Sequence, residues 1–258
     1  MIEGICQLCL EKKELCKAHI VPQSITKYLK NRFETSAGDL LFTNAQYPKR
    51  SPNGIYDPDI LCGDCDGKFS KYENIVLQLL FKQHDDSVIK YLLETEDDPS
   101  KRYTAEQERE IYNALRLFSI FTLWKASISR NEFVKNFSLG EFENDAYNIL
   151  QGKIVDDSLF KICIWDCSFV NQTNRAQLFT TARFRQIDEF TWCYLINLGI
   201  YQFYIFPNED CLKGLIEKTP SLSNLLINET DIRIYPMPLE FNERHNENFQ
   251  KFVSNKKR

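Results

Sequence analysis

Two pairs of cysteines with the same spacing are the residues of this 258-residue chain best suited to chemistry. Cys6 and Cys9 form one Cys-x-x-Cys, and Cys62 and Cys65 form another. A Cys-x-x-Cys turn aims two sulfurs at one point, and a tetrahedral Zn²⁺ ion needs two such pairs. We therefore expect a structural Zn²⁺ site, because four thiolates close the coordination shell. The alternatives are buried structural cysteines or a redox pair, the latter in a thiol oxidoreductase.

The elements around the second pair should position it. Apolar residues recur at three- and four-residue steps from Phe69 to Leu80, which predicts a helix over 66–83. The free N–H groups at the start of that helix favour thiolates. Cys16 is a spare thiol near the first pair. The remaining cysteines lie in a strand-like region, where we expect them in the core: Cys163, Cys167, Cys193 and Cys211.

A histidine lies between the two cysteine pairs, in Lys17-Ala18-His19-Ile20-Val21-Pro22. With Leu61-Cys62-Gly63-Asp64-Cys65 further on, the segment resembles the zinc-containing branch of the HNH (ββα-metal) endonucleases. That pattern runs Cys-x-x-Cys, His-Ile-x-Pro, a variable loop, then Leu-Cys-x-x-Cys opening a helix. The resemblance covers residues 1–85, a third of the chain, and implies a treble-clef zinc module.

The resemblance also implies roles for individual residues. His19 takes the place of the general base that activates water for attack on a phosphodiester. Asp66 takes the place of a residue that helps to hold a catalytic Mg²⁺ or Mn²⁺ ion. Glu73 lies two helical turns further on, where it either supports the site or is solvated. As alternatives, His19 packs against the zinc turn, and Asp66 is an acid favoured by the helix dipole.

This sequence departs from the family pattern at two places. Ala18 stands where these nucleases often carry an acid, and the later Asn that orients the histidine is not evident, with Asp59 near its place. These departures keep a second hypothesis open, in which the chain is a non-catalytic zinc-binding adaptor for nucleic acid or a partner protein.

Composition limits the class of protein. Hydrophobic residues make up 43% and charged residues 26%, which is enough for a packed core. No apolar run reaches the length of a membrane span, and the first residues lack the pattern of a secretory signal. With nine cysteines, an odd number, we expect reduced thiols and a cytoplasmic protein. The net charge of −4 argues against a strongly basic nucleic-acid surface. Several basic residues do cluster early in the chain: Lys12, Lys13, Lys17, Lys27, Lys30 and Arg32.

The periodicity predicts an α+β protein in three parts. Residues 1–85 form the zinc-binding HNH-like module, and 36–60 within it have loop composition. Residues 86–158 form a helical segment with a linker at 96–103, a capping box at Thr104, a buried helix near 114–124 and a helix over 141–150. Residues 159–258 form a β-rich domain, an antiparallel sheet with flanking helices. Its expected strands are 160–170, 177–185, 190–198, 200–206 and 232–235, followed by a helix over 239–253.

From the resemblance we expect a metal-dependent endonuclease that cuts DNA, and RNA less readily, with an associational link to bacterial anti-phage defence. The β-rich domain either scaffolds the zinc module or binds a partner protein. No membrane partner is expected.

Overall fold

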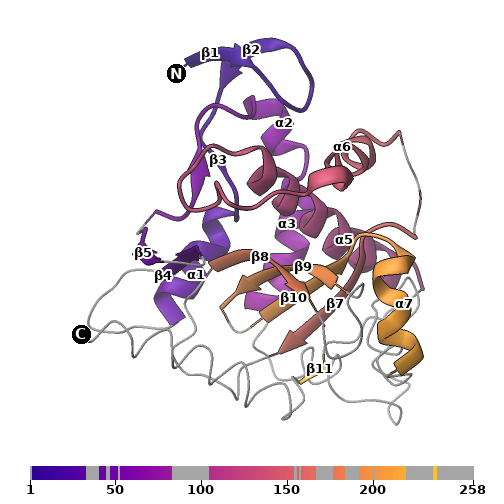
Figure 1. Cartoon of the computed structure of the whole chain (residues 1–258). Helices are drawn as coiled ribbons and strands as arrows, with labels where there is room; N and C mark the ends of the chain where they lie inside the picture. Colours follow the sequence, from indigo (N-terminus) through magenta and orange to yellow (C-terminus); the bar gives the residue numbers. More distant parts are fainter. Residues whose placement is uncertain are drawn as a thin grey trace.

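Helices and sheets are mixed in this fold, which is helix-rich at its centre (Figure 1). The computed structural model describes residues 2–32, 41–44, 47–51, 53–82, 105–153, 156, 158–166, 177–183, 192–199, 201–218 and 235–236. The mixture of helices with antiparallel sheets confirms the α+β class that the sequence predicts. Among the described helices, none is both long enough and apolar enough to cross a bilayer.

Two small antiparallel sheets come from the first sixty residues. One is a hairpin of β1 (Ile2–Ile5) and β2 (Lys12–Leu15). The other pairs β3 (Ala18–His19) with β6 (Tyr56–Asp57), and we call it the β3–β6 ribbon. Helix α1 (Gln23–Arg32) follows β3 along the chain. One of the four residues of the ribbon is His19, which our sequence analysis predicts to be a general base.

The helix predicted over 66–83 is present as three consecutive segments that together span residues 63–82. They are α2 (Gly63–Gly67), α3 (Ser70–Val76) and the π-helical η1 (Leu77–Lys82). Their apolar side chains point into the core, where Phe69 stacks on Phe121 with ring centroids 4.2 Å apart. The second cysteine pair therefore sits at the start of a helical run that is packed against the protein interior.

The centre of the fold is α5 (Ala105–Ile128), a helix of 24 residues. Its residues 118–126 are all buried, so apolar side chains cover it on every side, as the sequence predicts. Phe118 packs on Phe203 of the main sheet with ring centroids 5.9 Å apart. A short η3 (Gly140–Phe142) leads into α6 (Glu143–Leu150), which confirms the helix expected over 141–150.

Within the described residues, the main sheet has seven strands in the order β11-β7-β10-β9-β8-β4-β5. Most neighbours are antiparallel, but β11 runs parallel to β7, and β4 runs parallel to β8. The strands are β4 (Leu41–Asn44), β5 (Tyr47–Arg50), β7 (Lys161–Asp166), β8 (Gln177–Arg183), β9 (Trp192–Leu198), β10 (Tyr201–Phe206) and β11 (Tyr235–Pro236). Helix α7 (Glu209–Lys218) follows β10.

The sheet corrects one expectation. We interpreted residues 36–60 as a loop, but this stretch contributes β4 and β5 to the main sheet and β6 to the ribbon. Short strands with few apolar residues, recruited by pairing with a sheet distant in sequence, leave little local signal. The strands expected over 160–170, 177–185, 190–198 and 200–206 are confirmed where these ranges are described, at 161–166, 177–183, 192–198 and 201–206. The capping residue Thr104, Cys167 and the helix predicted over 239–253 lie outside the described residues.

Candidate metal centre and the ribbon beside it

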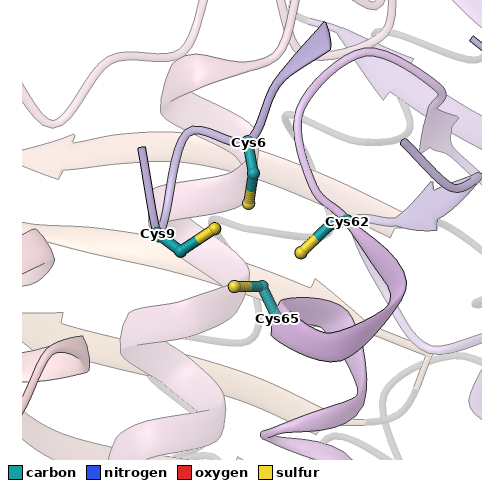
Figure 2. Close-up of side chains that lie close together, drawn as sticks. All are labelled: Cys6, Cys9, Cys62 and Cys65. Carbon is teal, nitrogen blue, oxygen red and sulfur yellow. The ribbon is translucent and has the colours of Figure 1, made fainter. Parts of the chain in front are cut away.

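The four cysteine thiols converge on one point (Figure 2). The Sγ atoms of Cys6, Cys9, Cys62 and Cys65 all lie within 4.8 Å of one another. A tetrahedral Zn²⁺ ion with Zn–S bonds of about 2.3 Å would place its sulfurs about 3.8 Å apart. Small side-chain rotations would therefore close the four thiols around an ion. Within the described part of the chain, no other group of three or more His, Cys, Asp or Glu side chains converges in this way.

Tight turns position each cysteine pair. After β1 the chain reverses through residues 6–10, where the N–H of Leu10 donates to the carbonyl of Cys6 at 2.8 Å. Leu10 has a φ of 61°, in the left-handed region. Cys62 is the N-cap of α2, and its carbonyl accepts the N–H of Asp66 at 3.0 Å. Cys65 is one helical turn along, which brings its thiol to the same side as Cys62.

Backbone hydrogen bonds join the two turns independently of any metal. The N–H of Gln7 donates to the carbonyl of Ile60 at 2.9 Å, and that of Cys16 donates to Leu61 at 2.8 Å. Leu15 also forms an isolated antiparallel bridge with Cys62. Two segments more than fifty residues apart in sequence are therefore already held in register.

Helix α6 supports the first cysteine turn from the outside. The carbonyl of Leu8, which lies between the two cysteines, accepts hydrogen bonds from the hydroxyl of Tyr147, at 3.3 Å, and from the side-chain amide of Gln151. On the other half, Lys68 donates to the carbonyl of Leu150 at 3.3 Å. Both halves of the cysteine cluster are thus attached to the end of one helix.

The thiols differ in their tendency to ionise. Burial acts to raise the pKa of Cys6, but hydrogen bonds from the backbone at Cys9, Cys62 and Leu8 outweigh it and lower this pKa to about 7. Burial and the neighbouring thiols raise the pKa of Cys65 well above its usual range. Four thiolates this close repel one another, so a bound cation would be needed to keep all four ionised. The donor set therefore suits a soft, tetrahedral metal ion such as zinc.

His19 lies on the ribbon, in register with Tyr56. Its ring is half-buried, and its centroid is 5.7 Å from that of Tyr56. Burial lowers the pKa of His19 below 6.5; a backbone hydrogen bond with Asn53 and the charge of Asp66 oppose this shift, while the charge of Lys125 adds to it. The imidazole is therefore neutral at pH 7, the protonation state that a general base requires.

The charge of Asp66 acts on both of the other residues that the HNH resemblance singled out. Asp66 is a half-buried residue of α2, and its charge raises the pKa of both His19 and Glu73. Burial is the larger cause for Glu73, and the ammonium of Lys125 opposes it. The ligand atoms of His19, Asp66 and Glu73 nevertheless do not all converge within the distance that groups the cysteines. They share a neighbourhood without forming a ready-made three-ligand metal site.

Lys125 is a site residue that our sequence analysis missed. Its side chain is 1% exposed, and its ammonium donates to the carbonyl of His19 at 2.6 Å and to Glu73 at 3.4 Å. It also lies 4.1 Å from the ring centroid of Phe121. The available signal was its position within a helix that is apolar on every side, because a buried lysine is rare unless it is paired.

Asp57 is the second residue that was missed. We placed Asp59 near the expected orienting residue, but Asp59 is exposed, whereas Asp57 is 4% exposed. Asp57 accepts hydrogen bonds from the hydroxyl of Ser129 at 2.6 Å, from the N–H of Arg130 at 3.0 Å and from the N–H of Asp59 at 2.9 Å. No sequence pattern distinguishes Asp57 from Asp59, because Asp57 is buried only by its tertiary contact with the residues that follow α5.

No family model, no curated protein and no solved structure matches this chain. The likeness to HNH nucleases therefore depends only on the cysteine pairs, the His-Ile-Val-Pro segment and their order.

Proposed function

We propose that the protein is a metal-dependent, HNH-like endonuclease that hydrolyses phosphodiester bonds in nucleic acid, DNA more readily than RNA. In this proposal the four cysteines hold a structural Zn²⁺ ion in a treble-clef module, and His19 is the general base. The observation that carries it is the convergence of the four cysteine Sγ atoms at the start of α2, with Asp66 directly after Cys65 and His19 half-buried on the ribbon.

The residues suit the chemistry of phosphodiester hydrolysis. His19 takes a proton from water as the water attacks phosphorus, and its lowered pKa keeps it ready for this role at neutral pH. Asp66 offers carboxylate oxygens that would hold Mg²⁺ or Mn²⁺, ions that bind through one or two carboxylates together with substrate phosphate and water. Such an ion supplies charge stabilisation for the phosphate and the leaving oxygen. Glu73 holds Lys125 in place and adds negative potential near Asp66.

Exposed lysines next to the ribbon and on the helical run would contact the phosphates of the proposed substrate. Lys17 is exposed, and its ammonium lies 5.7 Å from the ring centroid of Tyr56, which itself neighbours His19. Lys68 and Lys71 are exposed on the helical run that begins at the second cysteine pair. Phosphate contacts from a few lysines are sufficient to orient a nucleic acid, even on a chain with a net charge of −4.

A second candidate is a zinc-binding adaptor that binds nucleic acid or a partner protein without cutting. Two observations favour it. His19, Asp66 and Glu73 form no converged ligand group, and Ala18, in the place of the common acid, is fully buried. In this candidate the ribbon and the lysines would bind a backbone without catalysis.

A nicking assay on supercoiled plasmid separates the two candidates. Zinc-loaded protein should convert supercoiled to nicked DNA with Mg²⁺ or Mn²⁺, and His19→Gln should lower the rate by roughly a hundredfold or more. Asp66→Asn should also lower it, whereas Asp64→Asn is the matched control, because Asp64 is an exposed acid on the same short helix. Binding with no cleavage under either metal would select the adaptor. Equal rates for wild type and His19→Gln would refute the assignment of the base.

A further inference from the structure

The C-terminal end of α5 holds the strand that carries His19. The ammonium of Lys125 donates a hydrogen bond to the main-chain carbonyl of His19 over 2.6 Å. Its distance to the Glu73 carboxylate is longer, 3.4 Å. The shorter of these two polar contacts of the buried cation, and the one with ordinary hydrogen-bond length, is therefore with the histidine backbone.

The same end of the helix also holds the opposite strand of the ribbon. Tyr56 is the register partner of His19, and its carbonyl accepts a hydrogen bond from the side-chain amide of Asn131 at 2.7 Å. Asp57, the next residue, is bound by Ser129 and by the N–H of Arg130. Residues 125–131 thus bind the β3–β6 ribbon on both strands.

A buried ammonium is costly, so the contacts it makes indicate what it does. If Lys125 only paired with Glu73, the two charged groups would add little stability, because an apolar pair of similar volume packs at least as well. The bond to the His19 carbonyl has a different consequence, since that carbonyl is covalently fixed to the Cα atom that carries the imidazole. Moving the carbonyl moves the ring, and a displacement of about 1 Å at a reacting group costs roughly a hundredfold in rate.

We propose that Lys125 is a positioning residue, which sets the place of the His19 imidazole by binding the main-chain carbonyl of that residue. The inference rests on the proposed function, in which His19 acts as the base. Lys125 itself touches no substrate in this proposal. Its role is to transmit the rigidity of the buried helix α5 to a two-residue strand that is too short to hold its own geometry.

The test compares Lys125→Met with Lys135→Met in the full-length, zinc-loaded protein. Methionine retains the apolar stem and removes the ammonium, and Lys135 is an exposed lysine just beyond α5. In the plasmid assay, Lys125→Met should lower kcat roughly a hundredfold with little change in KM. Amide hydrogen exchange at residues 18–20 should become about tenfold faster or more, while residues 62–66 keep their wild-type exchange. Lys135→Met should match wild type in both measurements.

A double variant, Lys125→Met/Glu73→Gln, keeps the test decisive if the single variant misfolds, because it leaves no unpaired buried carboxylate. Faster exchange at residues 18–20 in the double variant supports the anchor on the His19 carbonyl. Wild-type exchange there would mean that Lys125 only neutralises Glu73, and the proposal would be wrong. If wild-type protein cuts no DNA, the nuclease proposal fails by itself, and the exchange experiment still decides whether Lys125 positions His19.

Discussion

Removing the carboxylate of Asp57 should destabilise the protein far more than removing that of Asp59, two residues away. Asp57 is 4% exposed and accepts three hydrogen bonds, which join the ribbon to the end of α5. The hydroxyl of Ser129 belongs to a residue that is itself only 7% exposed, so water cannot easily replace the lost partner. The backbone N–H groups of Arg130 and Asp59 belong to exposed residues and can be solvated more readily.

The magnitude follows from these three bonds. A hydrogen bond to a charged group contributes about 1.5–3 kcal/mol when its partner cannot find water, and about 0.5–1.5 kcal/mol is a fair figure for a bond that solvent partly replaces. One bond of the first kind and two of the second give about 2.5–6 kcal/mol for Asp57→Ala. Asp57→Asn keeps one acceptor oxygen and should cost roughly half as much. Asp59→Ala should stay within about 0.5 kcal/mol, as is usual for exposed positions.

Equilibrium unfolding in urea, with zinc held at constant excess, measures these differences. The midpoint for Asp57→Ala should fall by about 0.8–2 M, because the slope for a chain of this size is near 3 kcal/mol per molar, the upper end of the usual range. The slopes should agree among the variants. A loss below about 1 kcal/mol for Asp57→Ala, or equal losses for the two alanine variants, would refute the argument that α5 holds the ribbon through this carboxylate.

Three further outcomes are expected. Cys62→Ser should lower the zinc content and the unfolding midpoint, whereas Cys16→Ser, outside the converged set, should keep full zinc by metal analysis. The pKa of His19 is lower in the folded than in the unfolded protein. The contribution of the neutral imidazole to stability is therefore complete above about pH 6.5 and is lost as the pH falls through the lower, folded value. In urea titrations, wild type should lose more stability on acidification than His19→Gln. Gly54→Ala should destabilise by about 1 kcal/mol or more in the same titrations, because Gly54 has a φ of +81° and a Cβ there would lie 3.0 Å from Thr26, whereas Gly67→Ala, with open space around it, should be neutral or slightly stabilising.

The hydrophobic periodicity of the sequence predicted the helices, because a helix repeats within a few residues. The repeat from Phe69 to Leu80 gave the helical run, and the apolar stretch near 114–124 gave the buried part of α5, because helix periodicity is recorded within a few turns of sequence. The pairing of Cys6 and Cys9 with Cys62 and Cys65 was also predictable, since ligand spacing reflects the geometry of the ion rather than that of the fold.

The residues that escaped prediction owe their roles to contacts between distant segments. Strands β4 and β5 lie in a stretch of loop composition; β4 pairs with β8, more than 130 residues away, and β5 pairs with β4. Asp57 is a charged residue in ordinary surroundings until α5 and the ribbon meet, and the polar partners of Lys125 come from segments distant in sequence. A charged residue buried by tertiary contact looks, in sequence, like a charged residue on a surface, so only the coordinates distinguish Asp57 from Asp59.

The ribbon is held at two points, one beside the cysteine cluster and one at the buried helix α5. At its start, the N–H of Cys16 donates to the carbonyl of Leu61 beside the second cysteine pair, so a metal ion held by the cysteines would reinforce the entry to β3. At its end, Lys125 holds the carbonyl of His19 from the buried helix. Loss of metal should therefore loosen the entry to the strand and leave the carbonyl anchor in place, because that anchor belongs to the apolar core and not to the coordination shell. In the nuclease that we propose, a structural metal and a buried lysine would in this way position the His19 imidazole without either of them taking part in the chemistry.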